Sequence, residues 1–369
     1  MSERMREMNY GALRPGKIAI FRALYLGDLL LAVPALRSIR AAFPGAEITL
    51  IGLPWAASFV QRFSCYLDRF VEFAGYPGID EVAADAERVQ RFLEEQRAYG
   101  YDLVVQMHGS GRVSDQFALA LEGQVTVGYY QRTPPVGLTL GEPYPEDEPE
   151  VLRNLGLAKL LGCRDLDPRL EFPLFNEDRS EAARLLRNLS RANRLWVGLH
   201  AGAKSPARRW PVEYFARAAD HFAQHFDAQI ILTGSAIDES TVQALTECVR
   251  AYAGDRYSRP LNVVGQTSLG GLAALISELD LFISNDTGPA HLADAVNTPS
   301  VTIFGPVDPW RWAALDQSLH RIVRRPVACS PCAYWKCPID HRCLSWLKPE
   351  MVIEAGEELL LKGAVACDA

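Results

Sequence analysis

The stretch from Leu279 to Pro306 reads L-D-L-F-I-S-N-D-T-G-P-A-H-L-A-D-A-V-N-T-P-S-V-T-I-F-G-P. Its pattern predicts a strand, a polar turn, a helix and a second strand, over residues 281–283, 284–288, 290–296 and 301–304. The first apolar run is short enough for a buried parallel strand. Pro289 suits a first helical turn, because no backbone donor is missed there. The stretch therefore predicts a parallel α/β sheet.

The start of the predicted helix is a candidate nucleotide-diphosphate site, because open α/β sheets bind ligands at the carboxyl ends of their strands. Free amides of Thr287, Gly288 and Ala290 would point at an anion, and the helix dipole adds to the attraction. His291 faces the same space as a hydrogen-bond donor. The Asp286 carboxylate repels phosphate, so we expect it to cap the helix or to bind ribose. Taken alone, the motif also fits an ordinary capped turn.

Composition limits the class of protein. The chain has 369 residues, 49% of them apolar, which is enough for two domains with separate cores. A net charge of −7 gives no electrostatic footprint for nucleic acid. Residues 1–16 are charged and lack the apolar core of a secretory signal, and no apolar run approaches the ~20 residues that span a bilayer. We expect a cytoplasmic protein with at most peripheral membrane contact.

Strands and helices alternate on both sides of a weakly structured segment. Predicted strands before this segment cover residues 17–21, 47–51, 102–107 and 125–129, and predicted helices cover 29–43, 87–97 and 152–161. The proline-rich and acidic run 133–149 is predicted to be a surface loop. Further strands are predicted at 195–199, 228–232 and 261–264, and helices at 212–226, from 238, and at 268–277. We expect two doubly wound domains, 1–170 and 178–347, facing each other across a cleft.

Five motifs occur in the order seen in glycosyltransferase family 9, the bacterial heptosyltransferases with the GT-B fold. They are Arg22…Gly27-Asp28, Gly202-Ala203…Arg208-Arg209-Trp210-Pro211, Thr233-Gly234, Asp286-Thr287-Gly288…His291 and Phe304-Gly305-Pro306. The resemblance covers nearly the whole chain from Lys17. It implies transfer of a heptose from an ADP-linked donor to a saccharide or lipid-linked acceptor in lipopolysaccharide core synthesis. It also implies inversion at the anomeric carbon, no metal for chemistry, and a last helix, 348–369, that packs back on the first domain.

The resemblance assigns donor contacts to residues of the second domain. Arg208 stands where the family usually has a lysine that contacts the donor phosphates, and Lys204 is the competing cation. Gly202 and Ala203 leave the backbone open for close approach of phosphate. On the helix after Thr233-Gly234, two carboxylates are candidates for holding ribose, namely Asp238 and Glu239.

Asp28 is the candidate general base of the first domain. It follows the first strand, and a carboxylate there accepts the proton of an acceptor hydroxyl. An ordinary helix N-cap is the competing interpretation. Other residues expected on the acceptor side are Arg22, Gly27, His108 and Arg112.

Four cysteines near the carboxyl end have the spacing C-x2-C-x4-C-x5-C, at Cys329, Cys332, Cys337 and Cys343. The first pair has the knuckle spacing of zinc or iron–sulfur ligands, whereas the later spacings match no familiar zinc module. Similar cysteines occur in related glycosyltransferases. The resemblance implies iron for some protein-modifying heptosyltransferases, which bind it through four cysteines, and no metal for many other members. A structural zinc or iron and a group of packed free thiols both remain open.

The sequence leaves two other functions in competition with glycosyl transfer. A nucleotide-sugar epimerase of GT-B architecture would also place carboxylates and histidine in a cleft, but without a separate acceptor. A degenerate nucleotide-sugar-binding protein would have lost the catalytic activity. Arg208, which replaces the lysine usual in the family, leaves this alternative open. The sequence names neither the acceptor nor the sugar, and it does not indicate the oligomeric state.

Overall fold

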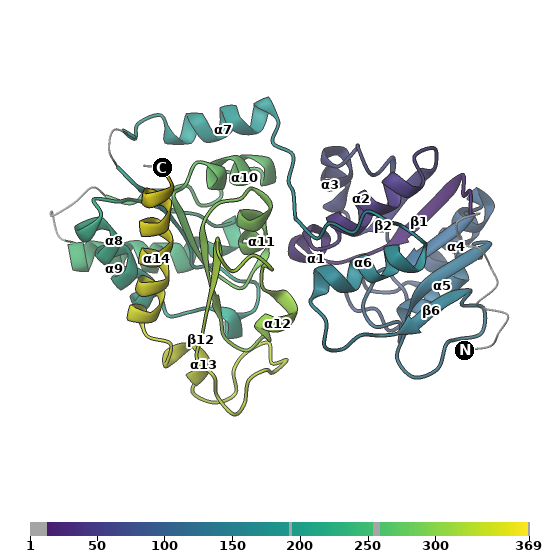
Figure 1. Cartoon of the computed structure of the whole chain (residues 1–369). Coiled ribbons are helices and arrows are strands. Elements are labelled where there is room, and N and C mark those ends of the chain that lie inside the picture. Colours follow the sequence, from purple (N-terminus) through teal and green to yellow (C-terminus); the bar gives the residue numbers. More distant parts are fainter. Residues whose placement is uncertain (1–12, 192–193, 254–258, 368–369) are drawn as a thin grey trace. The chain divides into compact units, whose positions relative to one another are not determined.

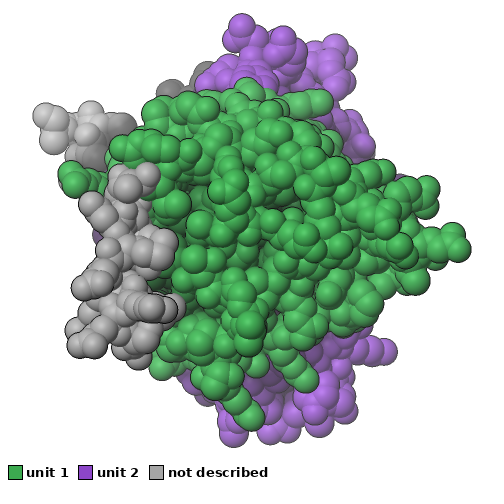
Figure 2. Space-filling model, turned by 90° about the vertical axis from the view of Figure 1, so that its right-hand side faces the viewer, with its two compact units in different colours: residues 1–169 green, residues 170–369 purple. Residues whose placement is uncertain are grey.

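The computed structural model describes residues 13–191, 194–253 and 259–367. Two units divide the chain, unit 1 over residues 1–169 and unit 2 over residues 170–369 (Figure 2). The division lies between Arg169 and Leu170. Residues 1–12, most of the segment tested for a secretory signal, lie outside the described residues.

Unit 1 is built on six parallel strands in the order β3-β2-β1-β4-β5-β6 (Figure 1). The strands are β1 Lys17–Phe21, β2 Glu47–Gly52, β3 Arg69–Glu72, β4 Leu103–Gln106, β5 Val125–Tyr130 and β6 Leu140–Pro143. The helices are α1 Leu26–Leu30, α2 Val33–Ala42, α3 Ala56–Arg62, α4 Ala86–Tyr99, α5 Ser114–Ala120 and α6 Glu150–Leu160. Central strands are apolar because both faces are covered: the four residues 18–21 of β1 are fully buried.

Two predictions for unit 1 were wrong in detail. The helix expected over 29–43 is two helices, because Pro34 lies in the first turn of α2 and cannot donate the bond that would continue α1. The loop expected over 133–149 contains strand β6, which pairs only with β5. As an edge strand it exposes Glu142 and Pro143, so it lacks the apolar pattern of the central strands.

Unit 2 repeats the arrangement with strand order β12-β11-β10-β7-β8-β9, again all parallel. Its strands are β7 Trp196–His200, β8 Gln229–Leu232, β9 Leu261–Asn262, β10 Leu281–Asn285, β11 Ser300–Phe304 and β12 His320–Arg324. Its helices are α7 Asn176–Leu186, α8 Val212–His225, α9 Glu239–Ala253, α10 Leu269–Ser277, α11 Gly288–Ala295, α12 Pro309–Trp312, α13 Arg342–Ser345 and α14 Pro349–Cys367. Two short 3-10 turns are η3 Pro206–Arg208 and η4 Ala236–Asp238. The opening sequence stretch is β10, α11 and β11, as predicted.

The last helix completes the core of unit 2. Helix α14 belongs to unit 2, where it packs on α8 and along β10, β11 and β12 (Figure 1). Its side chains Val352 and Leu359 are buried in the core of that unit. The apolar face of α14 is therefore used within unit 2, and the expected packing of this helix on the first domain stays a prediction.

Each sheet reverses its direction of growth once, and these reversals locate the candidate site. In unit 1 the strand order reverses between β1 and β4, and in unit 2 it reverses between β7 and β10. Loops at the carboxyl ends of such strand pairs diverge and leave a crevice in which α/β proteins bind ligands. The predicted residues Arg22 to Asp28 and His108 follow the first pair, and Gly202 to Arg208 and Asp286 to His291 follow the second.

No helix among the described residues combines the length and the apolar character needed to cross a bilayer.

Candidate functional site

In unit 2, Asn285 joins the two loops at the point where the strand order reverses. This fully buried residue ends β10, and its amide nitrogen donates to the carbonyls of Ala201 at 2.9 Å and Gly202 at 3.3 Å. Its side-chain oxygen accepts the amide of Trp210 at 3.0 Å. Both ends of the loop between β7 and α8 are thus fixed to β10. In the sequence, this asparagine stands in the predicted polar turn 284–288, and nothing local indicates its role.

Arg208 and Asp286 form an ion pair across these loops. Nη1 of Arg208 lies 3.2 Å from Oδ2 of Asp286, and the Asp286 side chain is only 5% exposed, against 39% for Arg208. The N-cap of α11 is Thr287 and not Asp286, while ribose binding, the other role expected of Asp286, stays a prediction. Asp286 holds the Arg208 guanidinium near the start of α11, and the exposed part of the Arg208 side chain can contact a ligand. A partner 78 residues away is invisible to local sequence patterns.

The start of α11 offers fewer free amides than expected. The amide of Ala290 donates to the carbonyl of Thr287 at 3.0 Å, so the amides of Thr287 and Gly288 remain as the anion donors there. Within the described residues, Oγ1 of Thr287 is buried without a hydrogen-bond partner. An oxyanion at this position would supply acceptors for these groups.

His291 lies in the first turn of α11 and acts as a neutral group. Its side chain is buried, and burial lowers its pKa to about 4, with the neighbouring Arg208 guanidinium adding to the lowering. At neutral pH the imidazole therefore donates a hydrogen bond without carrying charge. The structure brings Arg208, Asp286 and His291 together, and the positive charge of this cluster comes from the arginine.

The other residues predicted to bind the sugar donor differ in their exposure. A Cβ atom on Gly202 would lie 2.4 Å from the Asp238 carboxylate, so only glycine fits this close approach. Asp238 is buried and accepts bonds from the amide and the hydroxyl of Ser235, at 2.9 and 2.8 Å, which makes it a cap of η4. Ala203 is buried, whereas Lys204 and Glu239 are exposed.

In unit 1, Arg22 is a buried residue whose guanidinium is bonded to other residues of the same unit. It is 1% exposed, its Nε donates to the backbone carbonyl of Asp28 at 2.9 Å, and Nη1 donates to Met107. Its other contacts are the carboxylate of Glu150 and the amide oxygen of Asn154, each at 3.1 Å. Arg22 therefore ties the loop after β1 to the end of β4 and to α6.

Asp28 lies in the third position of α1 and not at its N-cap, which is Tyr25. Its carboxylate Oδ2 accepts the amide of Tyr25 over a long 3.3 Å. The side chain is partly exposed, as is Gly27. The interpretation of Asp28 as an N-cap is thus replaced by a helix-start carboxylate at the carboxyl edge of the sheet.

His108 is also more deeply placed than the sequence suggested. It is 8% exposed, stacks on Phe21 with ring centres 4.8 Å apart, and accepts the amide of Ala23 at Nδ1 over 3.2 Å. This bond puts the ring proton on Nε2, which lies 3.6 Å from the Glu81 carboxylate. His108 therefore supports the loop after β1. Arg112, by contrast, is exposed at the carboxyl edge.

The four cysteines lie close together without the arrangement of a metal site. All four, with His341, line one small apolar cavity. However, no three histidine, cysteine or acidic side chains of the described part of the chain are grouped so that they could hold a metal ion. Burial, with the neighbouring thiols adding to it, raises the pKa of Cys343 to about 11, so this sulfur stays protonated at neutral pH. The residues present therefore fit packed thiols.

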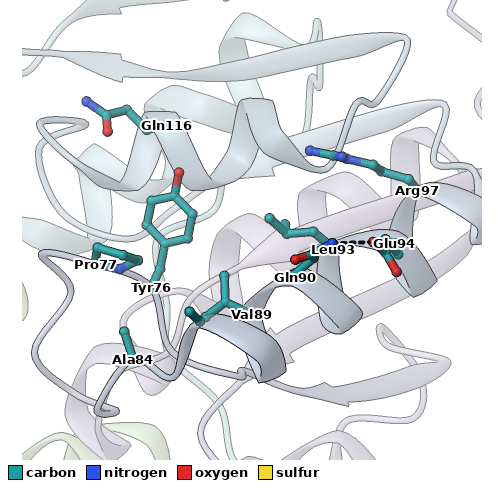
Figure 3. A pocket seen from close by; sticks show the side chains of 10 residues that line it. Tyr76, Pro77, Ala84, Val89, Gln90, Leu93, Glu94, Arg97 and Gln116 are labelled. Carbon is teal, nitrogen blue, oxygen red and sulfur yellow. Dashed lines mark hydrogen bonds between the residues drawn. The ribbon is translucent and has the colours of Figure 1, made fainter.

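An open groove in unit 1 is separate from these residues. Figure 3 shows its lining, with Tyr76, Val89 and Leu93 forming the apolar part and Gln90 donating to Glu94 at 2.9 Å. The lining comes from α4, the segment before it and α5. None of the predicted site residues lines the groove, so we do not include it in the candidate site.

Two Rossmann-like domains in sequence, each with a parallel sheet whose strand order reverses once, are typical of the GT-B class. The chain matches the profile of glycosyltransferase family 9 (heptosyltransferase) over residues 89–342, which is well over half of its length. The chain therefore belongs to glycosyltransferase family 9.

Individual relatives agree with this assignment. Over 166 residues the chain is 34% identical to lipooligosaccharide heptosyltransferase 2 of Campylobacter jejuni, covering 44% of this chain and 50% of that protein. Against lipopolysaccharide heptosyltransferase 3 of Escherichia coli it is 23% identical over 93% of this chain and 98% of the other. The structure of E. coli ADP-heptose lps heptosyltransferase II overlays with a TM-score of 0.71 and 22% identity, covering 94% and 99% of the two chains. The chain thus spans about half the length of the first of these relatives and nearly the full length of the other two.

Proposed function

We propose that the protein is an inverting glycosyltransferase that moves a heptose from an ADP-linked donor to a saccharide acceptor of the lipopolysaccharide core or a related cell-surface glycan. The observation that carries the proposal is the cluster of Arg208, Asp286 and His291 beside free amides at the start of α11. We take the sugar from the family, which is described as heptosyltransferase, and the nucleotide from a similar structure, which is named as an ADP-heptose enzyme.

The donor diphosphate is assigned to unit 2. Amides of Thr287 and Gly288 and the guanidinium of Arg208 would neutralise the charge that grows on the leaving ADP. His291 adds a neutral donor. The ion pair with Asp286 sets the orientation of the Arg208 side chain before the donor binds. This pre-organisation lowers the entropic cost of donor binding.

The acceptor is assigned to unit 1, with Asp28 as the general base. In the proposed step the Asp28 carboxylate takes the proton of an acceptor hydroxyl while the hydroxyl oxygen bonds to the anomeric carbon. The bond from that carbon to the ADP oxygen breaks, and ADP leaves with the electron pair. Attack opposite the leaving group inverts the anomeric centre. No metal or cofactor is assigned a part in this step.

A panel of nucleotide sugars tests the proposal directly. We expect ADP-linked heptose to raise the melting temperature, and ADP to be released only when a saccharide acceptor is present. An epimerase would convert the donor to an isomer with neither an acceptor nor ADP release. A degenerate binding protein would be stabilised by the donor and would perform neither reaction. Equal stabilisation by all the donors would argue against the assigned sugar and nucleotide.

Replacing His291 by alanine is expected to weaken ADP binding by about five- to thirtyfold, because one hydrogen bond in a buried site is lost. Isothermal titration of the full chain with ADP measures this change. His225→Ala is the matched control, since His225 is exposed and its Nδ1 donates to the backbone carbonyl of His221 in its own helix. Unaltered affinity in a folded His291→Ala protein would remove this residue from the site.

Arg208→Ala is expected to weaken ADP binding by about tenfold or more, because a charge-assisted contact with phosphate is lost. Lys204→Ala is expected to have a smaller effect, since Lys204 is exposed and it is Arg208 that pairs with Asp286. Arg208→Lys keeps the charge without the planar fork and should fall between wild type and Arg208→Ala. Titrations of the three variants with ADP give the order. A larger loss for Lys204→Ala would transfer the phosphate contact to that residue.

A further inference from the structure

The segment Ser330–His341, here called the clamp loop, holds the turn that carries Arg208. Turn η3 is only three residues long, and such short 3-10 turns have poor hydrogen-bond geometry of their own. Both backbone groups of its central residue, Ala207, bond to the clamp loop. The Ala207 amide donates to the Trp335 carbonyl at 3.2 Å, and Nε2 of His341 donates to the Ala207 carbonyl at 2.7 Å.

The clamp loop is itself anchored to the neighbouring strand. The amide of Cys332 donates to the Pro306 carbonyl at 2.7 Å, and the Ser330 hydroxyl donates to the Gly305 carbonyl at 2.9 Å. Gly305 and Pro306 directly follow β11. The loop therefore connects η3 to the residues that follow β11, and its contacts at Trp335 and His341 help to hold η3 in place.

His341 makes this contact from an unfavourable backbone conformation. Its φ of 56° and ψ of 31° place it in the left-handed region, where side chains other than glycine are uncommon. Glycine would suit this backbone better, so local folding alone does not explain a histidine here. What histidine adds is the hydrogen bond to Ala207.

We propose that His341 is a positioning residue for donor binding, which acts through Ala207 to hold Arg208 at the diphosphate site. The inference rests on the proposed role of Arg208. It extends the site to a residue that touches neither the donor nor the reacting atoms. Its effect is on pre-organisation: without the bond, η3 is held less tightly, and Arg208 loses more conformational freedom when the donor binds.

The test compares substitutions that separate this role from a structural one. His341→Gly relieves the backbone conformation and removes the bond, so we expect the melting temperature to be unchanged or higher, while the Kd for ADP rises about fivefold. The donor KM should rise equally, with kcat at saturating donor within about twofold of wild type. His341→Gln keeps a donor group and is expected to recover most of the affinity. His225→Ala again serves as the control.

A double-variant cycle decides between this inference and the proposed function. In an Arg208→Ala background, His341→Gly should change ADP affinity by less than about twofold, because the residue that it positions is gone. A full fivefold loss in that background would overturn the inference and make the effect a general structural one. Wild-type affinity in His341→Gly would also overturn it, while Arg208→Ala would still weaken ADP binding. If Arg208→Ala itself binds ADP normally, the assignment of the diphosphate site fails, and this inference fails with it.

Discussion

Asp28→Asn is expected to lower turnover by about 10²–10⁴-fold, the range typical of a lost general base. An amide is the same size as a carboxylate but cannot take the acceptor proton. ADP affinity should stay near that of wild type, because the donor groups lie in unit 2. Steady-state rates at saturating donor, together with ADP titration, measure both quantities.

The folded state should tolerate this substitution. Asp28 accepts the amide of Tyr25 at 3.3 Å, and an asparagine side-chain oxygen can accept the same bond. Arg22 bonds to the backbone carbonyl of Asp28, which the substitution does not alter. A loss of activity in Asp28→Asn would therefore report on chemistry.

Asp85→Asn provides the matched control for Asp28→Asn. Asp85 is an exposed aspartate at the N-cap of α4 in the same unit, and its Oδ1 accepts the amide of Arg88 at 2.8 Å. We expect this variant to keep wild-type turnover. If Asp28→Asn also turns over at that rate, Asp28 serves only the helix start, and the base must be sought elsewhere.

The architecture could be predicted from the sequence because parallel sheets leave a strong local signal. Strand β10 and helix α11 were located within a few residues, since a short apolar run followed by a turn and a proline has few alternatives. Strands at the edges of the sheets were harder. Short β3 is half-exposed and β6 contains a proline, so neither shows the continuous apolar run of a central strand.

Roles at the site were predictable only where they depend on local chain position. His291 and Gly288 could be placed at a helix start because the pattern around them is local. The ion pair of Asp286 was not predicted because its partner, Arg208, is distant in sequence. The roles of Asn285 and His341 were not predicted for the same reason, because their hydrogen bonds go to Gly202 and Ala207, which are distant in sequence. Long-range pairing of polar groups leaves no periodicity to read.

The buried charges of unit 1 lead to the largest expected change in stability. Glu150 is 4% exposed and lies between two buried guanidinium groups, at 3.1 Å from Arg22 and 2.6 Å from Arg153. Glu150→Gln keeps the shape of the side chain but removes its charge, so two positive groups are left without the carboxylate that compensates them. We expect the free energy of unfolding of unit 1 to fall by about 3–5 kcal/mol.

An exposed ion pair of similar length gives the control for Glu150→Gln. Arg97 and Glu122 are 3.0 Å apart in the same unit, but their side chains are 39% and 64% exposed. Glu122→Gln should change the free energy of unfolding by no more than about 1 kcal/mol, because water screens this pair. Denaturant unfolding of the full chain, followed by a probe in unit 1, measures both variants. Equal effects would show that burial does not strengthen the Glu150 contacts.

The same substitution links the stability of unit 1 to the catalytic proposal. Glu150 orients Arg22, and Arg22 holds the backbone of Asp28 through a 2.9 Å bond. Removing the second charge, as in Glu150→Gln/Arg22→Met, should recover part of the lost stability, since one uncompensated guanidinium is gone. Turnover of the double variant should not recover with its stability, because Arg22→Met removes the hydrogen bond to the backbone carbonyl of Asp28. Recovery of both quantities would show that Arg22 supports the fold of unit 1 without positioning the proposed base.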